Sequence, residues 1–295
     1  MSSVTGRVSE VKQPYGGYLP PKEMDKLEYD GDYLSKDNES SSSVCIGTVV
    51  DYLTRLELKH SFDDAFQISL LGLKRYYTMI KINEKLYQTY LKRFKKIKVG
   101  LDDNSIKLAC EFVGYDVYYR TSYFNEPTLN IPDDETINHI RTMVNRTLKF
   151  IQSCEGEISE DNSFLKQTFG GGFITGFTPL TTSGDFDFCI GEKMIDIKTI
   201  SKKINSKHTL QVLMYALMYN HMYPDTIKEV GIFNPRNNIY YYKRLSDIRD
   251  DYLEEIKNEV IGYNYPLKND NFEGVKFELF IASIDEHPFF ERVFE

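Results

Sequence analysis

The chain lacks tryptophan and has only four cysteines among its 295 residues. Because these cysteines are widely spaced, they match neither a zinc-knuckle pattern nor a disulfide framework. Apolar runs of about 18 residues are also missing, so no membrane span is predicted. The N-terminal residues lack the apolar stretch of a signal peptide. We therefore expect a cytoplasmic protein without a membrane partner. The cysteines are Cys45, Cys110, Cys154 and Cys189.

An excess of positive charge is missing as well, since the formal net charge is −8. This balance argues against a protein that coats nucleic acid, but it permits an enzyme that gathers carboxylates around a metal. Two local basic clusters remain. The cluster at residues 92–98 is equally well explained as a solvated face. The second consists of Lys198, Lys202, Lys203 and Lys207.

The first half of the chain is predicted to be mostly helical. Residues 1–43 are rich in Pro, Gly, Ser, Asp and Lys, which favours an irregular arm. Residues 44–295 are interpreted as a single domain whose core motifs lie in 173–262. Residues 105–120 are rich in Val, Tyr and Phe and are expected to contain strands. Helical patterning starts near Val44 and is also expected over 63–81, 84–97 and about 134–154.

The second half changes period and predicts strands alternating with helices. A hairpin is expected, with strands at 184–190 and 194–200 joined by a turn at Gly191-Glu192-Lys193. This order of elements predicts an α/β or α+β arrangement. The other elements expected are a strand entering a turn at 173–179, a helix at 209–223, strands at 230–235 and 238–243, a helix at 246–261 and a strand at 275–284.

Two acidic residues of this hairpin, Asp187 and Asp196, are candidates for metal binding. They lie on strands joined by a short turn, so their carboxylates could approach each other. Lys198 shares the face of Asp196, because side chains alternate along a strand and Ile197 points the other way. Mg²⁺ binds oxygen ligands, usually one or two carboxylates with water and substrate phosphate, and a nearby lysine can stabilise developing charge. Taken alone, an Asp-Ile-Lys triplet is more often a solvent-facing strand pair.

The helix that follows strengthens the functional interpretation. Gln211 and Tyr215 are four residues apart and share a helical face. The rest of this helix is apolar and is expected to pack on the sheet. The polar pair would then look toward the hairpin that carries Asp187 and Asp196.

With these residues in place, the sequence resembles the PD-(D/E)XK nuclease superfamily and, within it, the RecB-like exonuclease branch. The resemblance spans about Val44 to Tyr265 and is specific only over 184–215. Gly231–Pro235 and the later Ser246-Asp247-Ile248 also look like that branch. The motifs, in the order typical of the family, are Gly184-Asp185-Phe186-Asp187, Asp196-Ile197-Lys198-Thr199 and Gln211-Val212-Leu213-Met214-Tyr215.

The resemblance implies a fold and a metal site. The fold would be a restriction-endonuclease-like core, a central mixed sheet flanked by helices, with an N-terminal helical elaboration. Asp187 and Asp196 would bind one or two Mg²⁺ or Mn²⁺ ions, and the carbonyl of Ile197 would be a further ligand. Asp185 competes with Asp187, but the Gly-x-x-Asp spacing favours Asp187.

The resemblance also implies roles for three residues that do not bind the metal. Lys198 would position the nucleophilic water. Gln211 and Tyr215 would steer DNA or brace the active site. His208 lies near them in sequence, but a role at the helix start or on the surface is a better explanation than a phosphate contact.

An upstream helix in this branch usually reads Gly-x-x-x-His and supplies another metal ligand. Here Gly47-Thr48-Val49-Val50-Asp51 places Asp51 where the histidine would stand. Aspartate binds Mg²⁺ at least as well as imidazole, so Asp51 is the expected ligand, with a capping or surface acid as the alternative. Glu57 lies about 240° further around the helix, so the two cannot both face the site. The cysteine spacing does not match the iron–sulfur cluster of some members, so no cluster is expected.

These observations favour a Mg²⁺-dependent (or Mn²⁺-dependent) nuclease that hydrolyses DNA, an exonuclease of recombination, repair, phage replication or defence. Its partner would be single-stranded DNA or duplex ends. Two alternatives stay open. One is a non-catalytic module that binds nucleic acid or protein and retains the nuclease fold. The other is an RNase that uses the same site.

Overall fold

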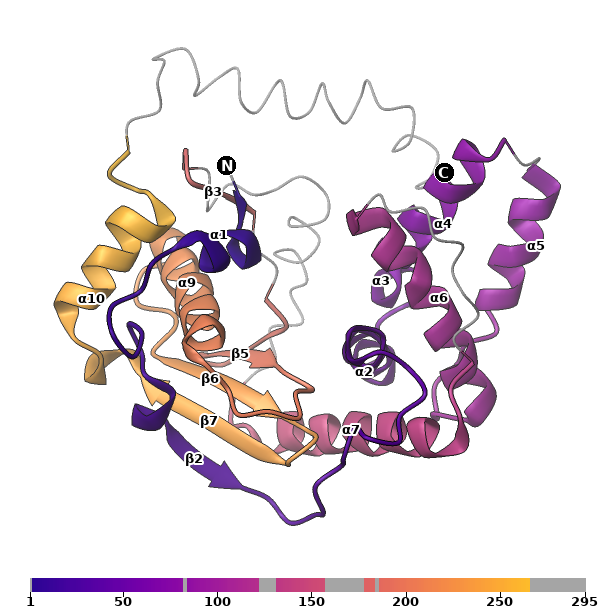
Figure 1. Ribbon diagram of the computed structural model, residues 1–295, viewed down its shortest axis with the longest axis horizontal. Coiled ribbons are helices and arrows are strands. Elements are labelled where there is room, and N and C mark those ends of the chain that lie inside the picture. The colour runs from indigo at the N-terminus through magenta and orange to yellow at the C-terminus, as the bar shows by residue number, and fades with distance from the viewer. Residues whose placement is uncertain (1, 82–83, 122–130, 157–177, 184–185, 266–295) are drawn as a thin grey trace.

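The computed structural model describes residues 2–81, 84–121, 131–156, 178–183 and 186–265. It has a five-stranded mixed sheet flanked by helices (Figure 1). The expected mixed α/β class is therefore confirmed. In Figure 1 the sheet lies on one side and helices α3–α6 on the other, while α7 runs along the lower edge between them.

The central sheet has the strand order β2-β7-β6-β5-β4. All neighbouring pairs are antiparallel except β5 and β6. Since parallel neighbours require a crossover, the chain leaves β5, passes through α9 (Ser206–Met222) and returns as β6. The strands are β2 Asp25–Glu28, β4 Phe188–Ile190, β5 Lys193–Ile197, β6 Glu229–Asn234 and β7 Ile239–Arg244.

Helix α9 begins at a capping box and covers one face of the sheet. The Asn205 side chain accepts hydrogen bonds from the backbone N–H groups of Lys207 and His208. The His208 ring in turn accepts from the Asn205 backbone at 3.3 Å. These bonds satisfy N–H groups that a helix start otherwise leaves without partners. The apolar residues of α9 share a buried cluster with Met194, Val230 and Ile232 of the sheet.

The opposite face of the sheet is covered by the end of α7 (Asp134–Ser153). The Phe150 ring stacks on Phe233 of β6 at a centroid distance of 4.1 Å. The first half of α7 packs instead with α2 (Ser43–Glu57) in a separate helical core. Helix α7 therefore links the sheet to the helical part of the molecule.

The helical part consists of α2 and four further helices beyond it. Their apolar side chains form one buried cluster with the start of α7. The expected helix over 63–81 is divided near Phe66, where the backbone departs from helical geometry. These helices are α3 Phe62–Ala65, α4 Gln67–Met79, α5 Glu84–Phe94 and α6 Asp103–Thr121.

The strands expected within residues 105–120 are wrong, because this segment is helix α6. Asp102 accepts a hydrogen bond from the Ser105 backbone and thereby satisfies a donor at the helix start. Ile106, Ala109 and Val113 then repeat at helical spacing and are buried in the helical core. The β-branched and aromatic residues of this segment are compatible with either a strand or a helix, and packing against the other helices stabilises the helix.

The N-terminal segment expected to be irregular instead contributes to the fold. Helix α1 (Val4–Glu10) begins at Ser3, which accepts from the Gly6 backbone, and it buries Val4 and Val8 against α9. The short β1 (Ser2–Ser3) pairs with β3 (Thr181–Ser183), and β2 forms one edge of the central sheet. The Pro, Gly and Ser content concealed these elements, because β2 is a strand only through its pairing with β7.

The last described element follows β7. After a 3₁₀ turn at Leu245–Asp247, helix α10 (Asp250–Glu255) continues as a π-helical segment over Ile256–Ile261. The strand expected at 275–284 and most of that expected at 173–179 lie outside the described residues. Among the residues that are described, no helix is long and apolar enough to cross a membrane.

Candidate functional site

The centre of the candidate site is the end of strand β5. Asp196 is 2% exposed, and the Lys198 ammonium lies 2.8 Å from its Oδ2 in an ion pair. Met194 and Asp196 belong to the α9 side of the sheet, whereas Ile195 packs on the α7 side. The two charged side chains therefore lie together on the α9 side, as strand alternation requires.

Asp187 joins this pair from the neighbouring strand. It directly precedes β4, and its Oδ2 accepts a 2.6 Å hydrogen bond from the backbone N–H of Ile197. The turn between the strands uses Gly191 at a φ of +56°, a left-handed conformation that glycine adopts without a steric penalty. The β4–β5 hairpin thus brings the Asp187 carboxylate to the Asp196-Ile197-Lys198 segment.

The charges at this hairpin perturb one another. Burial raises the pKa of Asp187 well above its usual range, and repulsion from Asp196 and Asp51 adds to the shift. Burial by itself would lower the pKa of Lys198, but attraction to Asp196 and Asp187 outweighs it and leaves the pKa raised. Lys198 therefore stays protonated near neutral pH. It can act as a cation and hydrogen-bond donor, but not as a general base.

Asp51 approaches the hairpin from helix α2. At Gly47, one turn earlier, a Cβ atom would lie 3.0 Å from Thr199 Oγ1, so this helix packs closely on the chain just after Lys198. The repulsion that Asp51 exerts on Asp187 agrees with this placement. The alternative acid, Glu57, is engaged elsewhere, because its carboxylate accepts from the backbone of Gly100 at 2.6 Å.

Arg55 is a further residue of the site, beyond those that the sequence motifs indicate. Its Nε donates to Asp51 Oδ1 at 2.9 Å, and its side chain is only 8% exposed. Its positive charge lowers the pKa of Asp187, which opposes the larger effects of burial and carboxylate repulsion. The Asp-x-x-x-Arg spacing on one helical face was the available signal. Asp51 is therefore neutralised by Arg55 in the same way as Asp196 is by Lys198.

Gln211 and Tyr215 lie together on α9 beside the hairpin. The Gln211 side-chain amide donates to the Tyr215 hydroxyl at 3.0 Å. Tyr215 is buried, and its ring centroid lies 6.4 Å from that of Phe186, the neighbour of Asp187. This arrangement fits a brace behind the carboxylates. His208 lies near the site as well. Burial lowers the pKa of its imidazole, and the positive charge of the nearby Lys198 lowers it further.

The residues that could hold a divalent metal are a pair of carboxylates rather than a larger cluster. Across the described ranges, no group of three or more His, Cys, Asp or Glu side chains is placed to hold a metal ion. Asp187 and Asp196, with the expected carbonyl of Ile197, nevertheless provide the hard oxygen donors that Mg²⁺ takes alongside water and substrate phosphate. Burial, and then repulsion from Asp196 and Asp51, disfavour the charged form of Asp187, and a bound cation would favour that form. Asp185 lies outside the described residues.

This electrostatic arrangement makes Asp187→Asn a stabilising substitution in the absence of metal. A carboxyl whose pKa is raised by folding binds its proton more tightly in the folded state, so stability is lost as pH rises above about 4 toward the raised pKa. Asparagine removes that loss and can still accept from the Ile197 backbone. We therefore expect a higher free energy of unfolding for Asp187→Asn than for the wild type at pH 7.

Urea unfolding in EDTA at pH 5 and pH 7 measures this effect. The gain should be larger at pH 7, and Asp25→Asn, which changes an exposed aspartate on edge strand β2, should show no comparable gain. Unfolding free energies that are equal in wild type and Asp187→Asn at both pH values would contradict the electrostatic account.

The basic cluster at residues 92–98 is largely matched by acids. Arg93 lies 2.5 Å from a Glu111 oxygen, Lys95 lies 3.3 Å from Asp63, and Lys98 lies 3.8 Å from Asp102. The cluster is exposed around helix α5 and beyond it. These ion pairs support its interpretation as a solvated face rather than as a binding track.

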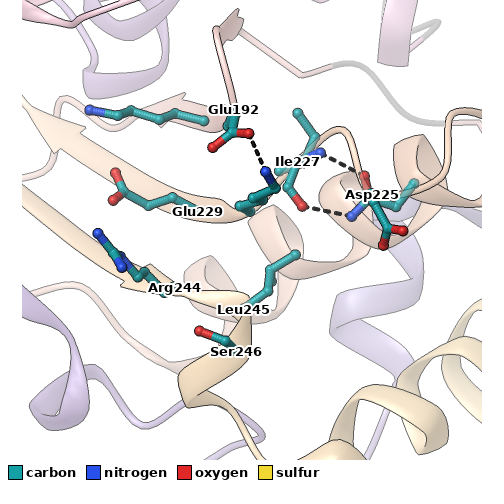
Figure 2. Close-up of a pocket in the computed structure, with 10 residues that line it drawn as sticks. Glu192, Asp225, Ile227, Glu229, Arg244, Leu245 and Ser246 are labelled. Atoms are coloured by element: carbon teal, nitrogen blue, oxygen red, sulfur yellow. Dashed lines mark hydrogen bonds and ion pairs between the residues drawn. The ribbon is translucent and has the colours of Figure 1, made fainter.

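A groove of about 770 Å³ lies at the other end of the sheet. Figure 2 shows Glu192, Glu229 and Arg244 in its lining, where β5 and β6 begin and β7 ends. Lys228 pairs with Glu192, and the Asn220 side chain is held by both backbone groups of Ile227. Since Lys228, Glu192 and Asn220 already have partners at this groove, it is a weaker functional candidate than the Asp187–Asp196 hairpin.

Comparisons of the chain with protein-family models, with curated proteins and with solved structures gave no match. The case for a function therefore depends on the residues of the site themselves. Those residues are two neighbouring carboxylates, a protonated lysine paired with one of them, and an Asp–Arg pair delivered by α2.

Proposed function

We propose that this protein is a metal-dependent nuclease with a PD-(D/E)XK site of the RecB-like type, acting on DNA phosphodiester bonds as a cytoplasmic exonuclease. One observation carries the proposal. Asp187, Asp196 and Lys198, which are spread over twelve residues of sequence, meet at one end of the β4–β5 hairpin, with Lys198 paired to Asp196.

The arrangement of the sheet supports a restriction-endonuclease-like core. The hairpin β4–β5 is followed by a helical crossover to the parallel strand β6 and then by the antiparallel strand β7. The proposed catalytic residues lie at the carboxyl end of β5, beside the start of α9. Sheet ends of this kind are common positions for sites in α/β proteins.

Each residue of the hairpin has a separate role in the proposed reaction. Asp187 and Asp196 would hold Mg²⁺ or Mn²⁺, which when bound supplies charge neutralisation on the phosphate and lowers the pKa of water. Lys198 would hold the attacking water in line and neutralise the charge that develops on the phosphate oxygens. Gln211 and Tyr215 would hold the β4–β5 hairpin in position from the α9 side. The Asp51–Arg55 pair would form the edge of the site on the α2 side.

The proposal predicts that the purified chain degrades linear DNA when Mg²⁺ or Mn²⁺ is added. Linear and circular DNA, as single strands and as duplexes, would be incubated in parallel with RNA. We expect loss of the linear DNA substrates, survival of the closed circles and no cleavage in EDTA. Cleavage of circles would show an endonuclease, and preferential loss of RNA would favour the RNase alternative. A chain that leaves all substrates intact with either metal would exclude the proposed activity.

One observation favours the alternative of a non-catalytic binding module. Both Asp51 and Asp196 already have cationic partners in Arg55 and Lys198, so neither carboxylate needs a metal for charge balance. Isothermal titration with Mn²⁺ separates the two proposals. Binding that disappears in Asp196→Asn supports the nuclease, whereas the absence of binding in the wild-type chain supports the binding module.

A further inference from the structure

Three lysines lie between β5 and the first turn of α9. Lys202, Lys203 and Lys207 are exposed, and within the described part of the chain none of them forms an ion pair. In the basic cluster at residues 92–98, in contrast, three of the basic residues form ion pairs with acids. Because the whole chain carries a net charge of −8, this patch is a local positive feature directly after Lys198. Such a patch attracts a polyanion.

A fully exposed tyrosine lies at one end of this lysine segment. Tyr15 is at the tip of a turn that the Gly17 backbone closes by donating to Pro14. The turn rests on the start of α9, since a Cβ atom at Gly17 would lie 2.5 Å from the Ser206 Cβ. Leu19 anchors the same segment by accepting from the Thr209 hydroxyl. The turn that carries Tyr15 is therefore fixed against the start of α9, while the Tyr15 side chain is fully exposed among the described residues.

A second exposed tyrosine lies at the other end of the segment. The Tyr33 hydroxyl donates to the backbone carbonyl of Ser201 at 3.3 Å, while the residue remains 52% exposed. The chain around it is fixed, because Arg146 donates to the Asp32 carbonyl and Leu34 donates to the Arg236 carbonyl. The ring is therefore held in place by its neighbours while about half of the residue stays open to water.

We propose that Tyr15, Tyr33 and the lysines between them form a binding surface for single-stranded nucleic acid. Sequence-tolerant recognition of single strands combines cations that follow the backbone with aromatic rings on which bases stack. Here the Tyr33 hydroxyl contacts Ser201, and the turn that carries Tyr15 packs on Ser206 through Gly17. The lysines lie within the segment 201–206 or directly after it. This inference rests on the proposed function, because the segment 201–206 connects Lys198 of the proposed nuclease site to this surface.

Stacking, rather than charge alone, is the distinguishing part of this inference. The carboxylates of Asp30 and Asp32 lie near Tyr33 in sequence and would oppose a purely electrostatic attraction. A base stacked on the ring would be largely independent of them. Duplex DNA keeps its bases paired, so it can use the lysines but not the tyrosines.

The test measures binding of a fluorescent dT20 oligonucleotide and of a 20-base-pair duplex in EDTA, with Asp196→Asn as the background so that no cleavage occurs. We expect Tyr15→Ala and Tyr33→Ala each to weaken dT20 binding about 10-fold and to change duplex binding little. Tyr33→Phe should bind dT20 nearly as wild type, because it keeps the ring and loses only the bond to Ser201. Replacing the three lysines by alanine should weaken both ligands and reduce the salt dependence.

Matched controls exclude general effects of surface substitution. Tyr223 is 43% exposed at the opposite end of α9, so Tyr223→Ala should leave dT20 binding unchanged. Lys85, Lys92 and Lys96 on or just after α5 are exposed, and their replacement by alanine removes the same charge from the helical part of the molecule. That triple variant should retain most of the affinity. Equal losses from Tyr33→Ala and Tyr223→Ala, or equal losses for duplex and dT20 in the tyrosine variants, would overturn the proposal.

The outcome separates this surface from the proposed nuclease activity. If the chain binds dT20 in a way that depends on these tyrosines but cleaves no substrate, the binding surface is supported and the nuclease activity is rejected. If the chain cleaves DNA but its dT20 affinity is unchanged in Tyr15→Ala and Tyr33→Ala, the nuclease activity is supported and the binding surface is rejected. The absence of any dT20 binding in low salt would also reject the surface.

Discussion

Replacing Lys198 by methionine is expected to reduce the rate of DNA cleavage about 100- to 1,000-fold, the usual loss when one preorganised donor to a transition-state charge is removed. The attraction of Asp196 and Asp187 keeps this lysine protonated even though it is largely buried. Methionine retains the aliphatic length and loses the charge. If the role of the lysine lies in the transition state, the loss should fall on kcat and leave KM nearly unchanged.

Two further variants separate the chemistry from folding. Lys198→Met leaves the buried Asp196 without its cation, so circular dichroism and urea unfolding must accompany the kinetics. Lys198→Arg keeps a cation beside Asp196 but changes its shape, and it should fold normally while remaining slow. Lys193→Met, at the opposite end of the same strand, should cleave at the wild-type rate. Unchanged cleavage by folded Lys198→Met would remove the lysine from the proposed mechanism.

The local geometry around Lys198 followed from the sequence, because strands alternate and hairpins have short turns. Alternation was enough to place Asp196 and Lys198 on one face, where they form an ion pair. The turn at Gly191 was enough to bring Asp187 to the same end of the hairpin. The apolar pattern of α9 likewise predicted the helix that covers this face of the sheet. These features depend on residues only a few positions apart.

Features set by distant partners were missed. Strand β2 pairs with β7 more than 200 residues later, and no local pattern in Asp-Lys-Leu-Glu marks it as a strand. Helix α6 cannot be distinguished from strands by its sequence alone, because residues rich in Val, Tyr and Phe satisfy both structures until the surrounding helices are known. The Asp51-x-x-x-Arg55 spacing indicates a local ion pair, but the effect of Arg55 on Asp187 depends on the packing of α2 beside the hairpin.

Another long-range feature is a buried ion pair between Glu39 and Arg236. Arg236 is 1% exposed and donates to both Glu39 carboxylate oxygens, at 2.6 and 3.0 Å. Its Nε also donates to the carbonyl of Thr199, at 3.3 Å. His139 of α7 completes the group with a 2.8 Å contact to the same glutamate. The pair therefore joins the helical part of the molecule to the chain that follows Lys198.

Arg236→Met is expected to lower the free energy of unfolding by about 3–5 kcal/mol, because it leaves the Glu39 carboxylate buried without its main partner. That is a large share of the stability of an ordinary domain, which is about 5–15 kcal/mol. Glu39→Met alone should cost a similar amount by leaving the guanidinium unpaired. Urea unfolding in metal-free buffer measures both changes, with the midpoint shifting and the slope unchanged.

The double variant Glu39→Met, Arg236→Met distinguishes an electrostatic contact from a positioning one. Removing both charges avoids an unpaired ion, so most of the lost stability should return. The hydrogen bond from Arg236 to the Thr199 carbonyl does not return, and it holds the chain one residue beyond Lys198. We therefore expect a double variant that is nearly as stable as the wild type yet slower in cleavage. A double variant as unstable as either single one would show that shape, rather than charge pairing, makes these residues necessary. Full cleavage activity in a stable double variant would show that the Thr199 contact does not position Lys198.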